Sequence, residues 1–219
     1  MKHKTVSLAD QVFERLESEI ICGKYQRGQV LTELGLTEDL GVSRTPVREA
    51  VQRLEQEQLV RNLPKGILVL GVTDRDIQEI YTIRLRIEGL AAARAAENRD
   101  EDGVRALAEA LAMQEYFVFK QDADHIKSQD SLFHEAVYEM SGSGILQATL
   151  LPLHRKVQKY RQISMQSEER AKRSLEEHRA IYEAICKGDA ELAEKLMTAH
   201  IEHAMVRLFA EQLGSPKSE

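Results

Sequence analysis

The sequence is poor in aromatic residues and in the residues that interrupt helices. Its 219 residues include no tryptophan and only 5% aromatic residues, so any core must consist mainly of aliphatic side chains. With 4 prolines and 12 glycines, long helices can run without interruption. The length suits two modest domains, and the 42% of hydrophobic residues is enough to build a core in each.

Other absences exclude whole classes of protein. The chain has no run of about 18 consecutive apolar residues, so it predicts no membrane span. The N-terminal segment, which begins Met-Lys-His-Lys-Thr, has no apolar core of signal-peptide length. The only two cysteines, Cys22 and Cys186, lie far apart in the chain, and we expect no disulfide between them. These features predict a cytoplasmic protein with reduced cysteines.

Charge is unevenly distributed. The net charge of −6 does not suit a protein that coats nucleic acid, but residues 1–73 contain equal numbers of basic and acidic side chains. Within that part, basic residues gather at Arg44, Arg48, Arg53, Arg61 and Lys65. Local charge dominates within a Debye length, about 10 Å, of a phosphate. The pattern therefore allows DNA binding with a small electrostatic footprint.

The segment from Leu40 to Gln52 has the pattern of two helices joined by a tight turn. Gly41 ends the first helix, and we expect Ser43 to cap the second with its side-chain oxygen. Pro46 falls in the first turn of the second helix, where a missing N–H group costs nothing. The second helix has an apolar face, formed by Val47, Val51 and Leu54.

The start of the second helix is basic. Arg44 and Arg48 are four residues apart and therefore share one face, from which each can contact guanine O6 and N7. Ser43 and Thr45 can donate to phosphates beside the free backbone N–H groups of the helix N-terminus. The alternative is that the arginines only solvate a helix face. We interpret the segment as a helix-turn-helix that places a recognition helix in a major groove of double-stranded DNA.

The surrounding pattern completes a winged helix-turn-helix over 1–73. Helices are expected over 8–22, 33–40 and 44–56, and two β-prone runs between 59 and 70 predict a hairpin around Asn62–Gly66. Lys65 and Gly66 form its tip, where Gly66 would let the wing approach the DNA closely. Arg53, about one turn beyond Arg48, is a candidate phosphate contact. For Arg53 and Lys65, simple solvation is an equal alternative.

The rest of the chain, 74–219, predicts an all-α bundle of about six helices, so the whole fold is mainly α. A long helical pattern follows Thr73, and no strand pattern occurs after Leu70. Further helices are expected near 101–121, 124–141, 144–166, 168–187 and 189–213.

Several of these segments resemble a known family. Gly23–Gly28, Leu40–Ala50 and Leu54–Val60 are similar to the DNA-binding domain of GntR-family transcription regulators. The second half resembles the FCD type of effector domain of the FadR subfamily, on the motifs Ile83–Glu88, Asp130–His134, Glu177–Ile181 and Ala190–His200. The sequence departs from the family at three positions, with Arg27 in place of Pro, Gln58 in place of Gly and Ser143 in place of Asn.

The resemblance implies a divalent metal inside the bundle, bound by Asp130, His134, His178 and His200. Asp130 and His134 are also one turn apart on one predicted helix, as two ligands of one ion would be. Three imidazoles and a carboxylate suit a transition metal (Zn, Ni, Mn or Fe) rather than Ca or Mg. The alternative is that these are ordinary core or surface histidines. The remaining helical histidines match no ligand position: His125, His154 and His203.

In the family, open positions on the metal take a carboxylate of a small organic acid. Arg84 is a candidate to bind a second carboxylate of that effector, or it pairs with Glu88 one turn along its helix. Helix phase alone also places Tyr138 and Arg161 as candidates to line the pocket.

These features predict a homodimeric repressor on a palindromic operator, controlled by a small carboxylate effector. Effector binding would repack the helices around Arg84 and the linker near 72–76. A purely structural metal site is one alternative. A metal-dependent enzyme is another, with Glu135 or Glu177 as a base, but the attached DNA-binding domain and the absence of a His-Glu-x-x-His motif argue against it.

Overall fold

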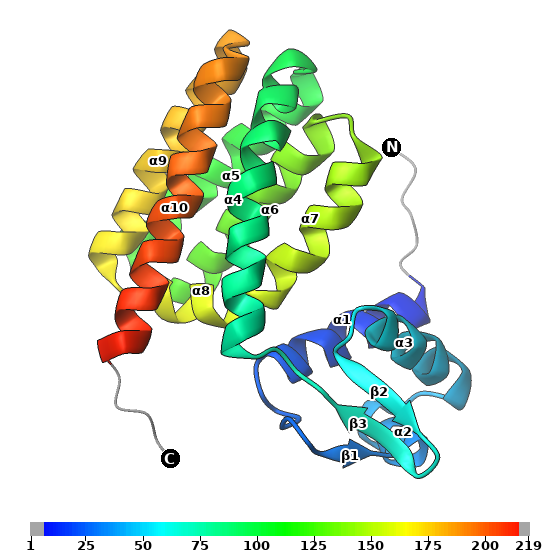
Figure 1. Cartoon of the computed structure of the whole chain (residues 1–219). Coiled ribbons are helices and arrows are strands. Elements are labelled where there is room, and N and C mark those ends of the chain that lie inside the picture. Colours follow the sequence, from blue (N-terminus) through cyan, green and yellow to red (C-terminus); the bar gives the residue numbers. More distant parts are fainter. Residues whose placement is uncertain (1–6, 215–219) are drawn as a thin grey trace. The chain divides into compact units, whose positions relative to one another are not determined.

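The computed structural model describes residues 7–214, apart from the side chains of 162–164 and 210–214. Contacts divide the chain into two compact units, with the boundary between Asp74 and Arg75. The first unit is a winged helix and the second is a helical bundle, so the predicted fold class is confirmed (Figure 1). No helix within the described residues is long and apolar enough to cross a membrane.

The first unit has three helices and a small antiparallel sheet with the strand order β1-β3-β2. The wing pairs Val60 with Val69 and Leu63 with Gly66, which leaves Pro64 and Lys65 as its turn. β1 is only two residues long, too short to show a periodicity, and the sequence did not predict it. The elements are α1 (Leu8–Ile21), β1 (Val30–Leu31), α2 (Glu33–Leu40), α3 (Arg44–Gln56), β2 (Val60–Leu63) and β3 (Gly66–Val69).

Helix ends in this unit follow local chemistry, with one correction. α1 begins with a capping box, in which the Ser7 hydroxyl accepts from the Asp10 N–H group at 3.0 Å. α2 ends at Gly41, whose φ of 68° is left-handed. Ser43 is the first residue before α3, as expected, but its side chain makes no capping hydrogen bond, so that prediction was wrong. Gln58 has a φ of 59°, which explains why glycine is usual at this position in the family.

The core of the first unit lies between α1 and α3. The apolar stripe of α1, which includes Phe13 and Leu16, is buried against Val47 and Leu54 of α3. Burial of each large aliphatic side chain contributes roughly 1.5–3 kcal/mol. This packing fixes α3 with its apolar face inward and its arginines outward.

The wing glycine is required by packing within this unit. Gly66 has a φ of 141°, and a Cβ atom at this position would lie 2.5 Å from the carbonyl oxygen of Leu31 in β1. The close approach of β1 to β3 is therefore enough to explain why this residue is glycine, whether or not it also contacts DNA.

The second unit consists of helices throughout its described length. The helix predicted over 144–166 is in fact two helices, which are separated at the buried residue Val157. Pro152 lies inside α7 shortly before this break, but no glycine or proline occupies the break itself, so the sequence does not place it. The elements are α4 (Asp74–Glu97), α5 (Glu101–Lys120), α6 (Ala123–Met140), α7 (Gly144–Lys156), α8 (Gln158–Met165), α9 (Glu168–Lys187) and α10 (Ala190–Gly214).

A small residue lets α4 lie close to α10 at one point, and the two helices run side by side (Figure 1). A Cβ atom on Gly89 would collide with Thr198 of α10. The C-terminal half of α4 is lined with alanines that are fully buried, namely Ala91, Ala92, Ala95 and Ala96. The same helix carries longer polar side chains, at Arg84 and Glu88, into the interior.

Replacement of Gly66 by alanine tests the packing role of this residue. Gly66→Ala should lower the free energy of unfolding by roughly 3 kcal/mol, because it combines an unfavourable φ with a collision against β1. Gly41→Ala is the matched control, since its φ is also positive but a Cβ atom there meets nothing within 4 Å. That variant should lose only about 1 kcal/mol. Equal losses in urea unfolding would contradict the packing explanation.

Candidate metal centre and DNA-reading helix

The N-terminus of α3 presents its polar side chains to solvent. Ser43, Arg44, Thr45 and Arg48 are all exposed, whereas Pro46 is buried on the opposite face. The first turn of α3 contains no acidic side chain, so its N–H groups and helix dipole are available to a phosphate. This arrangement has the chemistry needed to bind a DNA backbone and to reach base edges.

Arg48 pairs with a neighbouring helix in the free protein. Its Nε donates to Oε2 of Glu33 in α2 at 2.8 Å, and both side chains are exposed. A pair of this kind contributes only about 0–1 kcal/mol. Arg48 can therefore exchange this partner for a base or a phosphate at little cost.

Arg53 is held within its own domain. Its Nη1 donates to Oδ1 of Asp10 at 2.6 Å, and its guanidinium carbon lies 3.9 Å from the centroid of the Phe13 ring. This geometry favours a packing role between α3 and α1 over a phosphate contact. Lys65 is exposed at the turn of the wing, where the alternatives of solvation and phosphate contact both remain.

Inside the second unit, the structure brings together the four residues that the family resemblance implies as ligands. Asp130 and His134 come from α6, His178 from α9 and His200 from α10, and all four are buried. One ligand atom from each lies within 4.8 Å of all the others. His125 and His203 are outside this group and exposed. The set has the composition and the spacing of a transition-metal site.

A neighbouring oxygen orients two of the three imidazoles. Nδ1 of His178 lies 2.9 Å from Oε1 of Gln114, and Nδ1 of His200 lies 2.8 Å from Oε2 of Glu177. Because these oxygens can only accept, the Nδ1 atoms must carry the protons. Nδ1 of His134 lies 3.5 Å from Oε2 of Glu88, and neither atom forms a hydrogen bond to a described residue. Oxygens in this arrangement commonly hold metal-binding histidines in the correct tautomer.

This tautomer leaves the Nε2 lone pairs of His178 and His200 available to a ligand. Nε2 of His178 is buried and makes no hydrogen bond to any described residue. It lies 3.5 Å from Oδ1 of Asp130, another ligand atom of the group. An unbonded acceptor in the interior is costly, and a cation at this point would satisfy it. The residues therefore fit a divalent metal.

The electrostatics of the group keep the imidazoles of His178 and His200 neutral. Burial lowers the pKa of His200 to about 4 and holds that of His178 well below its usual range. Burial alone would raise the pKa of Glu177, but the hydrogen bond from His200 and the charge of Arg170 outweigh it and lower the pKa to about 2. A neutral imidazole beside an ionised carboxylate is the state that binds a metal.

Arg84 is buried and forms the intrahelical pair that the sequence left as one of two alternatives. Its Nε donates to Oε1 of Glu88 at 2.7 Å, and the hydroxyl of Tyr138 donates to the same oxygen at 2.5 Å. Arg84 also lines the cavity beside the histidines, whereas Tyr138, a candidate from helix phase, is not among its lining residues.

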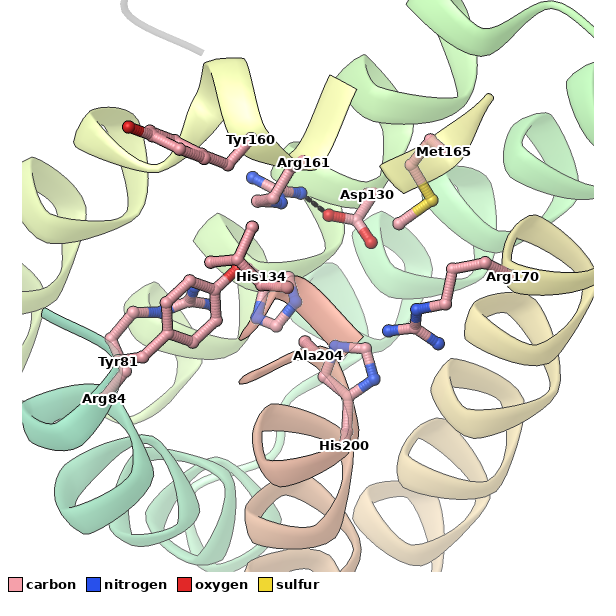
Figure 2. A pocket seen from close by; sticks show the side chains of 11 residues that line it. Tyr81, Arg84, Asp130, His134, Tyr160, Arg161, Met165, Arg170, His200 and Ala204 are labelled. Atoms are coloured by element: carbon pink, nitrogen blue, oxygen red, sulfur yellow. Dashed lines mark ion pairs between the residues drawn. The ribbon is translucent and has the colours of Figure 1, made fainter. Parts of the chain in front are cut away.

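The cavity is lined by side chains from five helices (Figure 2). Arg161 of α8 forms an ion pair with Asp130, drawn as a dashed line in Figure 2. Arg170 of α9 points in from another side and donates to Glu177 at 3.0 Å. The open space between them is about 20 Å³, which is close to the size of one water molecule.

Sequence reasoning missed several residues of this site. Gln114, Arg170 and His154 carry no local motif, and their roles depend on contacts between helices. His154 is buried, contacts Arg161 through Nε2 and lies 3.4 Å from the Tyr138 hydroxyl. It also forms a second close group with Glu88 and His134.

Comparisons with known proteins define the family. The model of the bacterial regulatory proteins of the gntR family matches residues 8–68, and the FCD domain model matches residues 79–203. The chain therefore belongs to the GntR family of transcription regulators, in the group with an FCD domain, and is a DNA-binding regulator of that family.

Individual relatives carry the names of regulators. The gluconate operon transcriptional repressor of Bacillus subtilis is 35% identical over 127 residues, which are 58% of this chain and 52% of that repressor. The uncharacterized HTH-type transcriptional regulator YdhC of the same organism is 29% identical over 195 residues, which are 88% of this chain and 87% of that protein. The solved structure of Escherichia coli McbR/YncC matches with a TM-score of 0.79 and 26% identity, covering 95% of this chain and 100% of that chain. These names indicate regulation rather than catalysis.

Acid sensitivity provides a test of the Glu177 environment. Because the folded-state pKa of about 2 lies below the ordinary value of 4.5, the unfolded chain binds the proton first as the pH falls. The stabilisation is present above pH 4.5 and is lost as the pH falls through about 2. At neutral pH, metal-free Glu177→Gln should therefore have a lower free energy of unfolding than the wild type. Between pH 4.5 and about 2, its free energy of unfolding should fall less than that of the wild type. Parallel pH profiles in thermal unfolding would contradict the assignment.

Proposed function

We propose that the protein is a dimeric repressor whose binding to a palindromic operator is controlled by a small organic acid at a metal centre in the helical bundle. The observation that carries this proposal is the buried group of Asp130, His134, His178 and His200, in a chain that also has a winged helix with an exposed basic α3. The buried group would supply a ligand-dependent signal, and the winged helix would supply DNA binding.

The metal would be held by the four residues of the buried group. Their chemistry suits Zn, Ni, Mn or Fe, and such a metal supplies open coordination positions that accept a carboxylate. Gln114 and Glu177 would hold His178 and His200 in the binding tautomer through the contacts at 2.9 and 2.8 Å.

Operator contacts would come from α3 and the wing. Arg44 and Arg48 would read guanines, each worth roughly 1–3 kcal/mol of discrimination. Ser43 and Thr45 would donate to phosphates at the start of α3, and Lys65 would reach the backbone from the wing. The unused hydroxyl of Ser43 supports this assignment, because it has no capping hydrogen bond to give up.

We expect a dimer because a single α3 helix can contact only a few base pairs. A two-fold dimer would place two such helices in successive major grooves of a palindrome. The name of the gluconate operon transcriptional repressor supports repression as the sign of control.

Effector binding would reach the DNA-binding unit through α4. This helix carries Arg84 and Glu88 at the cavity and begins at Asp74, the boundary between the two units. Typical couplings of this kind are about 1–3 kcal/mol, which is the most by which the effector can shift the DNA-binding equilibrium.

A purely structural metal is a second candidate function for the same site. The small open space of about 20 Å³ favours it, since no organic acid fits there without movement of the walls. The two candidates differ in whether a carboxylate stabilises the metal-loaded protein.

Loss of Arg48 tests the reading helix. Arg48→Ala should abolish specific operator binding in a gel-shift assay and leave the metal content unchanged. Arg53→Ala is the control, because Arg53 is committed to Asp10 and Phe13 and should affect stability more than DNA binding. Undiminished operator binding by Arg48→Ala would show that α3 does not read bases through this residue.

Loss of His134 tests the metal site. Elemental analysis of the purified protein should find about one transition metal per chain, lost in His134→Ala and kept in His203→Ala, whose histidine is exposed. A carboxylate should raise the melting temperature of the wild type only when the metal is present. Full metal occupancy in His134→Ala would refute the site, and metal without any carboxylate response would favour the structural alternative.

A further inference from the structure

Six charged side chains meet around the cavity, and each is paired with one of opposite sign. Among the described residues that line or bond into the cavity, three are arginines and three are carboxylates. Five are at most 6% exposed as residues, and the side chain of Glu177 is 15% exposed. The pairs are Arg84 with Glu88, Arg161 with Asp130, and Arg170 with Glu177. Glu177 also pairs at 3.1 Å with Arg173, whose side chain is 56% exposed and lies outside this buried set.

This set has no net charge. The ligand imidazoles do not change the balance, because metal-binding histidines must be neutral. Charges buried this deeply remain ionised only when they are paired. The buried arginines and carboxylates around the cavity are therefore electrically balanced.

A divalent metal would upset this balance in a specific way. It would add two positive charges and would take the carboxylate of Asp130, with which Arg161 forms an ion pair. Arg84 and Arg170 would keep theirs, because neither Glu88 nor Glu177 belongs to the four-residue ligand group. Arg161 also contacts the uncharged side chains of His154 and Ser131.

We propose that Arg161 is the internal cation that occupies Asp130 when the metal is absent and becomes the anion receptor when the metal binds, so that the effector is a small dianion such as a dicarboxylate. This inference rests on the proposed metal-dependent function and deepens it. One carboxylate would bind the metal, the other would bind the guanidinium of Arg161, and together they would restore neutrality. Arg161, and not the sequence candidate Arg84, would thus bind the second carboxylate of the effector.

The geometry of the cavity is consistent with this exchange. One wall of the cavity is formed by α8 through Tyr160, Arg161 and Met165. From this wall, the side chain of Arg161 points toward Asp130 (Figure 2). In this position the guanidinium fills the space beside the ligand group, and only about 20 Å³ remains open. Withdrawal of Arg161 from Asp130 would free both a ligand oxygen and the room for an organic acid.

The decisive variant is Arg161→Gln, because the proposal predicts opposite changes in two affinities. Removal of the competing cation should raise the affinity of the full-length protein for Zn²⁺ by roughly tenfold in chelator competition. Removal of the receptor should lower the affinity of the metal-loaded protein for succinate or malate by roughly tenfold or more in calorimetry. A merely structural role would weaken both. Arg179→Gln is the matched control, since Arg179 is exposed and pairs with Glu115 at 3.0 Å.

The wild-type protein gives a test that needs no variant. The metal-loaded chain should prefer malonate, succinate and malate to the monoanions propionate, butyrate and lactate, and Arg161→Gln should lose this preference. If Arg161→Gln does not fold, Arg161→Lys keeps the charge and should retain the preference at reduced affinity.

The outcomes separate this inference from the proposed function. A wild type that binds no metal would overturn both. A wild type that binds metal and responds equally to monoanions and dianions would overturn only the inference. Reduced Zn²⁺ affinity in Arg161→Gln would also overturn it, because Arg161 would then support the metal site instead of competing with it.

Discussion

The pairing of buried charge is the constraint on which the second unit depends. Its interior is largely apolar, and an unpaired ion there would cost several kcal/mol. Two of the pairs lie within single helices, but their carboxylates also reach other helices. Glu88 of α4 accepts from Tyr138 of α6, and Glu177 of α9 accepts from His200 of α10. The pair between Arg161 and Asp130 joins α8 to α6. The polar network therefore fixes how five helices of the bundle lie against one another.

The same network lies in a bundle with few aromatic residues. Ala92 and Ala96 are fully buried on α4, and Gly89 lacks the side chain that would collide with α10. Long polar side chains at Arg84 and Glu88 then extend into the space that short ones leave. A change in charge at the cavity would act on the packing of α4, because packed helices shift between discrete arrangements rather than deform continuously.

The sequence predicted the fold well where the signal was periodic or local. The helices of the winged helix, the hairpin and the bundle follow from apolar spacing and from Gly41, Pro46 and the wing turn. The failures were at places without such a signal. β1 is two residues long, the break between α7 and α8 falls at Val157 and not at the nearby Pro152, and the hydroxyl of Ser43 does not cap α3.

Some residues of the site could be predicted from the sequence, and others could not. The family resemblance implied Asp130, His134, His178 and His200, and the structure brings them together, although binding of a metal stays a prediction. The oxygens of Gln114 and Glu177 orient two of these histidines from positions 64 and 23 residues away along the chain. Such contacts cannot be read from spacing on one helix. The same holds for Arg161, whose partner is set by the packing of α8 against α6.

The pair between Arg48 and Glu33 has a consequence for how the protein searches DNA. In the proposed complex, Arg48 leaves Glu33 when it reaches for a base, and Glu33 is then a bare carboxylate close to the phosphates. The exchange costs little, but its cost is the same on every sequence, whereas a bidentate contact to guanine discriminates against other bases by roughly 1–3 kcal/mol. Glu33 would thus weaken binding to incorrect sequences, where Arg48 gains no such contact to offset the cost, without touching DNA itself.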